Sequence, residues 1–137
     1  MPCREHVAQL CQHQHAFRQR RARVAIVSFG TLPAVQQWLR ETCADFDVLL
    51  DRQREVYRAY GLERSFWRSR NLRTLWLYLQ RNLRGIHGGD SHGDDTTQLG
   101  GDFVIHSSGR VLLAYRSHDP TDRPAVETLL RALETQR

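Results

Sequence analysis

DFVIHSSGRVLLAY, residues 102–115, decides the fold, because it predicts two strands joined directly by a tight turn. Two apolar runs flank the turn sequence HSSG, in which Gly109 supplies a backbone conformation that other residues rarely adopt. A turn this short joins antiparallel neighbours, whereas parallel strands need a long crossover. The segment therefore predicts a β-hairpin.

Strand and helix patterns alternate upstream of this hairpin. Residues 3–20 have apolar positions at helical spacing, and ARVAIVSF (22–29) is a β-branched run that predicts a strand buried on both faces. A second helix, the strand DFDVLLD (45–51) and a third helix that Asp51 caps come next. After the hairpin, a closing helix begins near Pro124. The alternation is typical of a parallel sheet covered by helices.

This order of elements predicts an α/β fold, a thioredoxin-like three-layer sandwich whose mixed sheet ends in a C-terminal hairpin. That fold has a central strand immediately before its cysteine-bearing helix, and here only Met1 and Pro2 precede Cys3. We therefore expect one domain over residues 1–137 that lacks this strand, with a helical insertion at about 63–98.

Composition and charge favour a soluble cytoplasmic protein. No apolar run is long enough to span a membrane, and the first twenty residues lack a secretory signal. Three cysteines are too few for a disulfide framework, in agreement with a reducing compartment. The net charge is +5 and every basic residue is arginine, but the arginines are dispersed along the chain, so we do not expect a nucleic-acid partner.

Cys3 is the candidate reactive residue. At a helix N-terminus the free N–H groups and the helix dipole favour a thiolate, and Arg4 adds a positive charge. His6 lies three residues on, on the same side of the helix, where it could accept the thiol proton. These features predict a Cys3 pKa lowered from about 8.5 towards neutrality, unless Cys3 is simply a frayed terminal residue. Cys11 is expected to be a small core hydrophobe, and Cys43 is expected to be structural.

The segments CREHVAQL (3–10), DRQREVYRAYGL (51–62) and QLGGDFVIHSSGRVLLAYRSHDPTDRP (98–124) resemble a known family. They are similar to the peroxiredoxin-like branch of the alkyl hydroperoxide reductase/thiol-specific antioxidant family, which includes prostamide/prostaglandin F synthase-like proteins. The resemblance implies a thioredoxin fold without a cofactor. It also implies reduction of peroxides or disulfides at the expense of a thioredoxin- or glutathione-like thiol.

Many members of that family carry CxxCRE at the tip of the first helix. Cys3 matches the second cysteine of this motif, because Arg4 and Glu5 follow it. The first cysteine and the central strand would then precede Met1, so we expect an N-terminal truncation that leaves Cys3 as the only redox residue.

Four residues before the hairpin are predicted to line the substrate site, because in thioredoxin-like folds this turn faces the redox cysteine. They are Leu99, Gly100, Gly101 and Asp102. The glycines would let a partner's backbone come close. HGGDSHGDD (87–95) contains metal-ligand side chains, but its spacing matches no strong template, so we expect a solvated loop and no metal site.

FWRSRNLRTLWLYLQRNLRGIHGG (66–89) predicts a helix with an apolar stripe and a cationic remainder. The first interpretation is that the stripe packs on the domain core. In that position the helix could also cover a hydrophobic substrate groove. The stripe also suits a peripheral contact with an anionic membrane or a homodimer interface. The second functional hypothesis is accordingly a redox-silent thioredoxin-like module that binds a partner through this helix.

Overall fold

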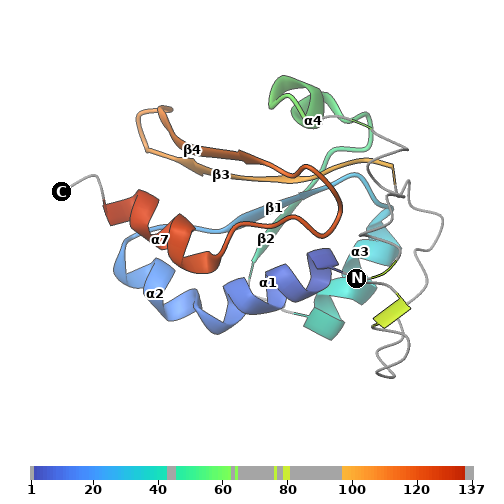
Figure 1. Cartoon of the computed structure of the whole chain (residues 1–137), viewed down its shortest axis with the longest axis horizontal. Coiled ribbons are helices and arrows are strands. Elements are labelled where there is room, and N and C mark those ends of the chain that lie inside the picture. The colour runs from blue at the N-terminus through green and yellow to red at the C-terminus, as the bar shows by residue number, and fades with distance from the viewer. Residues whose placement is uncertain are drawn as a thin grey trace.

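The computed structural model describes residues 2–42, 46–62, 64, 76, 79–80 and 97–134, with the backbone alone for Pro2 and Cys3. Its elements are α1 (Pro2–Gln12), α2 (Gln14–Gln19), β1 (Ala25–Ser28), α3 (Leu32–Thr42), β2 (Asp47–Leu50), α4 (Glu55–Ala59), β3 (Gly101–Ile105), β4 (Val111–Arg116) and α7 (Val126–Glu134). Figure 1 shows α1, α2, α3 and α7 on one side of the strands and α4 on the other. Most of the insertion predicted at 63–98, including the loop at 87–95, lies outside the described residues.

The predicted first helix is present as two helices, because α1 ends at Gln12 and α2 begins at Gln14. The predicted helical spacing is confirmed, since the apolar residues Val7, Leu10 and Phe17 are buried. They form one side of the core, which α7 and β3 complete. The buried members of this core are Val7, Leu10, Phe17, Phe46, Val104, Val126 and Leu129.

The predicted parallel pair is confirmed, with Ala25 of β1 opposite Asp47 of β2 and Ser28 opposite Leu50. The expectation that β1 is buried on both faces is wrong: Ala25 is exposed and the rest of the strand is only half-buried. Among the described strands, β1 pairs with β2 alone.

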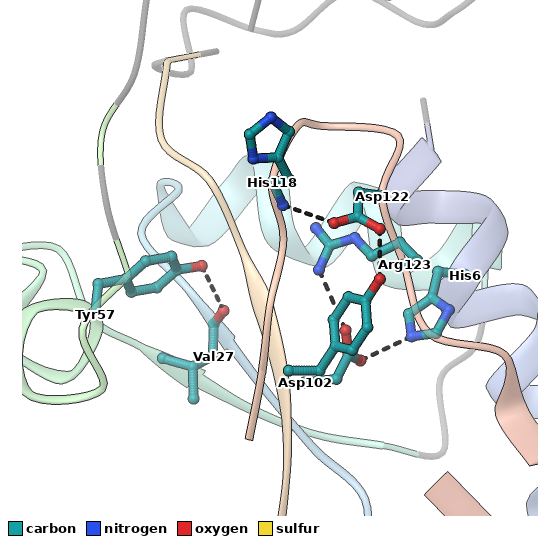
Figure 2. Close-up of polar contacts among 8 residues, drawn as sticks. His6, Val27, Tyr57, Asp102, His118, Asp122 and Arg123 are labelled. Carbon is teal, nitrogen blue, oxygen red and sulfur yellow. Dashed lines mark hydrogen bonds and ion pairs between the residues drawn. The ribbon is translucent and has the colours of Figure 1, made fainter. Parts of the chain in front are cut away.

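The second edge of β1 is identified by its carbonyl groups. The Ser28 carbonyl accepts the Asp51 N–H (2.7 Å) on the β2 side. Successive carbonyls of a strand point to opposite edges, so the Val27 carbonyl points away from β2. It accepts a hydrogen bond from the Tyr57 hydroxyl (3.0 Å; Figure 2), so a side chain rather than a described strand contacts this edge of β1.

The predicted hairpin is also confirmed. β3 and β4 pair antiparallel from Gly101 opposite Arg116 to Ile105 opposite Val111, with an irregularity after Val104. Gly109 has a φ of 87°, which is the turn geometry that its position predicts. The described strands form two separate two-stranded sheets, so the parallel and antiparallel parts of the expected mixed sheet are not hydrogen-bonded to each other.

The Asp51 carboxylate satisfies the first N–H groups of α4, as the predicted cap requires, although Arg54, with a φ of 56°, stands at the N-cap position. One carboxylate oxygen accepts the Glu55 N–H (2.9 Å) and the other accepts the Tyr57 N–H (3.1 Å). Asp51 is buried, so the two bonds satisfy an anion that is withdrawn from water. The same bonds fix the start of α4 and place the Tyr57 hydroxyl against β1.

Cys11 is disulfide-bonded, which contradicts the expectation of a free core thiol. Its side chain packs against the core between the helices and the hairpin. Along α1, Cys3 is eight residues away, about 12 Å at 1.5 Å per residue. That separation exceeds the Cα–Cα distance that a disulfide spans. Cys43 lies outside the described residues.

Candidate functional site

Cys3 lies in the first turn of α1, where the sequence predicts it, and its side chain lies outside the described residues. The next residue, Arg4, extends to α3, where its guanidinium pairs with the Glu41 carboxylate (2.9 Å). Much of the positive charge expected from Arg4 is therefore neutralised by α3.

His6 is the buried polar residue of α1, with 5% of its surface exposed. Its Nε2 atom lies 2.7 Å from Oδ1 of Asp102 on β3 (Figure 2). Its Nδ1 atom is buried and has no hydrogen-bond partner among the described residues. A buried polar atom without a partner is uncommon and calls for an explanation such as catalysis. Two predicted site residues, 96 positions apart in the chain, are thus in direct contact.

Asp102 is held from a second direction by Arg123, which precedes α7. Arg123 donates from Nη1 to Oδ2 of Asp102 at 3.4 Å, and both side chains are largely buried. Figure 2 shows the imidazole and the guanidinium approaching the same carboxylate. The three residues form a line of charged and polar groups, Arg123–Asp102–His6, that ends one helical turn after Cys3.

The predicted substrate-lining residues have several different surroundings. Leu99 is 2% exposed, so its side chain packs inside the molecule. A Cβ on Gly100 would lie 2.6 Å from Nη2 of Arg123, and a Cβ on Gly101 would lie 2.6 Å from the Tyr115 carbonyl oxygen. In this conformation the two glycines give room to Arg123 and to β4.

The segment after β4 fixes Arg123 in place. Asp119 accepts two hydrogen bonds from Thr121, from its N–H (2.8 Å) and its hydroxyl (2.6 Å). Asp122 accepts one from the His118 N–H (2.7 Å) and one from the Tyr115 hydroxyl (2.5 Å). These bonds join the segment to itself and to β4.

Tyr115 has a pKa raised above its ordinary value of 10.0. The main cause is its hydrogen bond to Asp122, which would be lost on ionisation, and burial adds to it. The negative charges of Asp122, Asp102 and Asp119 raise it further.

A groove of about 600 Å³ lies beside His6. One wall comes from α1 and the turn after it, with Glu5, His6, Gln9 and His13. The other wall comes from the segment that holds Arg123 and from the start of α7. A small molecule in this groove would lie beside His6, the last residue of the Arg123–Asp102–His6 line.

Arg123, Tyr115 and Asp122 were not identified from the sequence as site residues. The available signal was the segment SHDPTDRP (117–124), whose acidic residues alternate with turn formers. Such residues are typical of any loop, so the pattern does not point to a site.

Other parts of the chain contribute little to this site. Trp76 and Leu79, two members of the predicted stripe, are 58% and 57% exposed. Among the described residues, no three His, Cys, Asp or Glu side chains are grouped to hold a metal ion. Within the same residues, no helix is both long and apolar enough to cross a membrane.

Comparison with known families gives one match. The family described as AhpC/TSA antioxidant enzyme matches residues 9–119, well over half of the chain. The matched range includes Asp102 but begins after Cys3 and His6 and ends before Arg123. Neither the curated proteins nor the solved structures give a significant match.

Proposed function

Because the chain belongs to the AhpC/TSA antioxidant enzyme family, we propose that it reduces peroxides or disulfides through Cys3. Within the family we assign it to the peroxiredoxin-like branch that includes the prostamide/prostaglandin F synthase-like proteins. The observation that carries the proposal is the buried His6 imidazole. It lies one turn after Cys3; one nitrogen bonds Asp102, and the other has no partner among the described residues.

The proposed first step is attack of the Cys3 thiolate on a peroxide. His6 accepts the thiol proton at Nδ1, and the sulfur attacks the terminal peroxide oxygen. The O–O bond breaks, Cys3 becomes a sulfenic acid, and two electrons pass from sulfur to oxygen. His6 returns the proton to the departing alkoxide, which leaves as an alcohol, or as water when the substrate is hydrogen peroxide.

The proposed second step restores the thiol with a small thiol or a thioredoxin-like protein. One thiol condenses with the sulfenic acid, releases water and forms a mixed disulfide with Cys3. A second thiol then attacks the mixed disulfide and releases Cys3. We propose the cytoplasm as the compartment, because it supplies such thiols; the disulfide at Cys11 is then an exception to the usual state of cysteines there. Leu99, Gly100 and Gly101 stay the proposed substrate-lining residues, and Asp102 acts on the reaction through His6.

Peroxide consumption with glutathione as the reductant tests this function. We expect Cys3→Ser to abolish consumption and Arg110→Gln, an exposed change on the hairpin that leaves every cysteine in place, to retain it. Iodoacetamide should also react fastest with Cys3, and Cys3→Ser should remove that fast phase. Consumption that persists in Cys3→Ser would contradict the proposal.

The second candidate is a binding module, favoured by the exposure of Trp76 and Leu79. Exposed apolar side chains next to arginines suit an anionic membrane surface. Co-sedimentation with vesicles of phosphatidylserine and phosphatidylcholine tests it, and the double variant Arg73→Glu, Arg81→Glu should abolish binding. Binding that survives both changes would exclude this helix as the contact.

A further inference from the structure

We propose that Asp102 and Arg123 are positioning residues that keep the proton of neutral His6 on Nε2, and so leave Nδ1 free to accept the Cys3 proton. The inference deepens the proposed function and rests on it for the part that concerns Cys3. The part that concerns the imidazole is measurable on its own.

The hydrogen bond to Asp102 selects the tautomer. A carboxylate only accepts hydrogen bonds, so an imidazole nitrogen 2.7 Å from Oδ1 of Asp102 must carry the proton. Neutral imidazole has one N–H, and Nδ1 therefore presents its lone pair. The groove reaches the His6 side chain, but the Nδ1 atom itself is buried, and no group among the described residues hydrogen-bonds to it.

Arg123 keeps the carboxylate in the orientation that this bond needs. Its Nη1 contacts the oxygen of Asp102 that His6 does not use. The absence of a Cβ at Gly100 gives the guanidinium its room, and the hydrogen bonds of Asp119 and Asp122 fix the segment that presents it. Arg123 thus acts on His6 through Asp102.

Other titratable groups lie near His6, and variants compared in a pH experiment must leave them unchanged. Glu5 and His13 line the groove from α1 and the turn after it, and Glu127 lines it from α7. None of these three is part of the Arg123–Asp102–His6 line. The variants below leave all of them unchanged.

The tautomer is measured by nitrogen NMR of the imidazole rings, with the His6 signals assigned by their loss in His6→Gln. In the unchanged protein near neutral pH we expect a protonated Nε2 and an unprotonated Nδ1. Asp102→Asn should move the population towards the Nδ1–H form, because the new amide can donate to Nε2. Arg123→Gln should shift the tautomer population in the same direction. Arg123→Lys keeps a positive charge beside Asp102, so most of the His6 rings should stay protonated at Nε2. Arg110→Gln, which removes an exposed hairpin arginine, is the control and should change nothing.

The link to Cys3 is tested by the rate at which iodoacetamide alkylates Cys3, measured as a function of pH. Mass spectrometry of the N-terminal peptide follows the reaction. Near neutral pH we expect Asp102→Asn to slow the reaction about tenfold, as expected when a proton acceptor is misoriented. Arg123→Gln should slow it less, and Arg123→Lys and Arg110→Gln should keep the original rate. Asp47→Asn, which breaks an exposed ion pair with Arg23, is the control for loss of a carboxylate.

Two results would overturn the inference. One is a His6 signal unchanged in both Asp102→Asn and Arg123→Gln. The other is a changed tautomer together with an unchanged Cys3 rate. Either result leaves the proposed function standing if Cys3→Ser still abolishes peroxide consumption. Conversely, peroxide consumption that persists in Cys3→Ser refutes the proposed function, but the NMR result still tests whether Asp102 and Arg123 set the His6 tautomer.

Discussion

Gly100 and Gly101 differ in what a side chain would meet, although they are neighbours in the chain. At Gly100 the nearest atoms belong to the end of the flexible Arg123 side chain. At Gly101 the nearest atom is a backbone oxygen of β4, which cannot move without breaking the hairpin pairing. Gly100 therefore leaves space for a side chain of the candidate site, and Gly101 leaves space for the backbone pairing of the hairpin.

Gly100→Ala should displace Arg123 at a stability cost below about 1 kcal/mol, whereas Gly101→Ala should cost about 1–3 kcal/mol. Urea denaturation measures both costs. The NMR signal of His6 should change in folded Gly100→Ala. An equal loss of stability in the two variants would contradict this distinction.

The raised pKa of Tyr115 predicts a pH effect with a definite sign. The folded protein holds the phenolic proton more tightly than the unfolded chain. The stabilisation is therefore complete below pH 10.0 and is lost as the pH rises through the folded pKa. The stability difference between the unchanged protein and Tyr115→Phe should narrow above about pH 10 in urea titrations. A difference independent of pH would show that the Asp122 bond does not control this proton.

Among the elements, the sequence predicted those that depend on local pattern. The hairpin at 102–115 and the Asp51 cap follow from residues within a few positions of one another, and both are confirmed. The contact between His6 and Asp102 spans 96 positions, and no local spacing encodes it. Sequence reasoning placed both residues in the site without placing them together, and it missed Arg123 because that arginine lies in an ordinary loop pattern.

The disulfide at Cys11 gives α1 a covalent link that the sequence did not predict. Because Cys3 is too far along α1, we predict Cys43, which directly follows α3, as the other cysteine. Peptide mapping under non-reducing conditions tests the pairing. A linked peptide with Cys3 would show that α1 unwinds.

Loss of that link should lower stability by about 2–5 kcal/mol. A reductant should therefore lower the melting temperature of the unchanged protein, and Cys11→Ser should melt at the lower temperature with or without reductant. Cys3→Ser is the control and should keep the sensitivity to reductant. A melting temperature that does not respond to reductant would contradict a structural role.

In the whole molecule, the two described sheets are small and weakly covered. Large apolar side chains are exposed on three of the four strands: Leu49 and Leu50 on β2, Ile105 on β3 and Val111 on β4. A strand with an unpaired edge and exposed apolar side chains is a template for pairing with another chain. We therefore expect the chain to self-associate through these strands.

Leu49→Lys should therefore reduce self-association without a large loss of stability, because its side chain is already exposed. Val56→Lys, an exposed position on α4, is the matched control and should leave association unchanged. Sedimentation velocity over a range of concentrations measures the effect. A monomer at all concentrations in the unchanged protein would refute the expectation.

The 96 positions between His6 and Asp102 also bear on the order of events during synthesis. While the ribosome is still making the middle of the chain, Cys3 and His6 are already outside, but the carboxylate that orients the imidazole does not yet exist. Arg123 follows 21 positions later still. Closing so long a loop carries an entropic cost that only the finished core repays. On the proposed mechanism, a nascent chain holds its thiol beside an imidazole that is not yet oriented, and full reactivity requires the last third of the protein to fold onto the first.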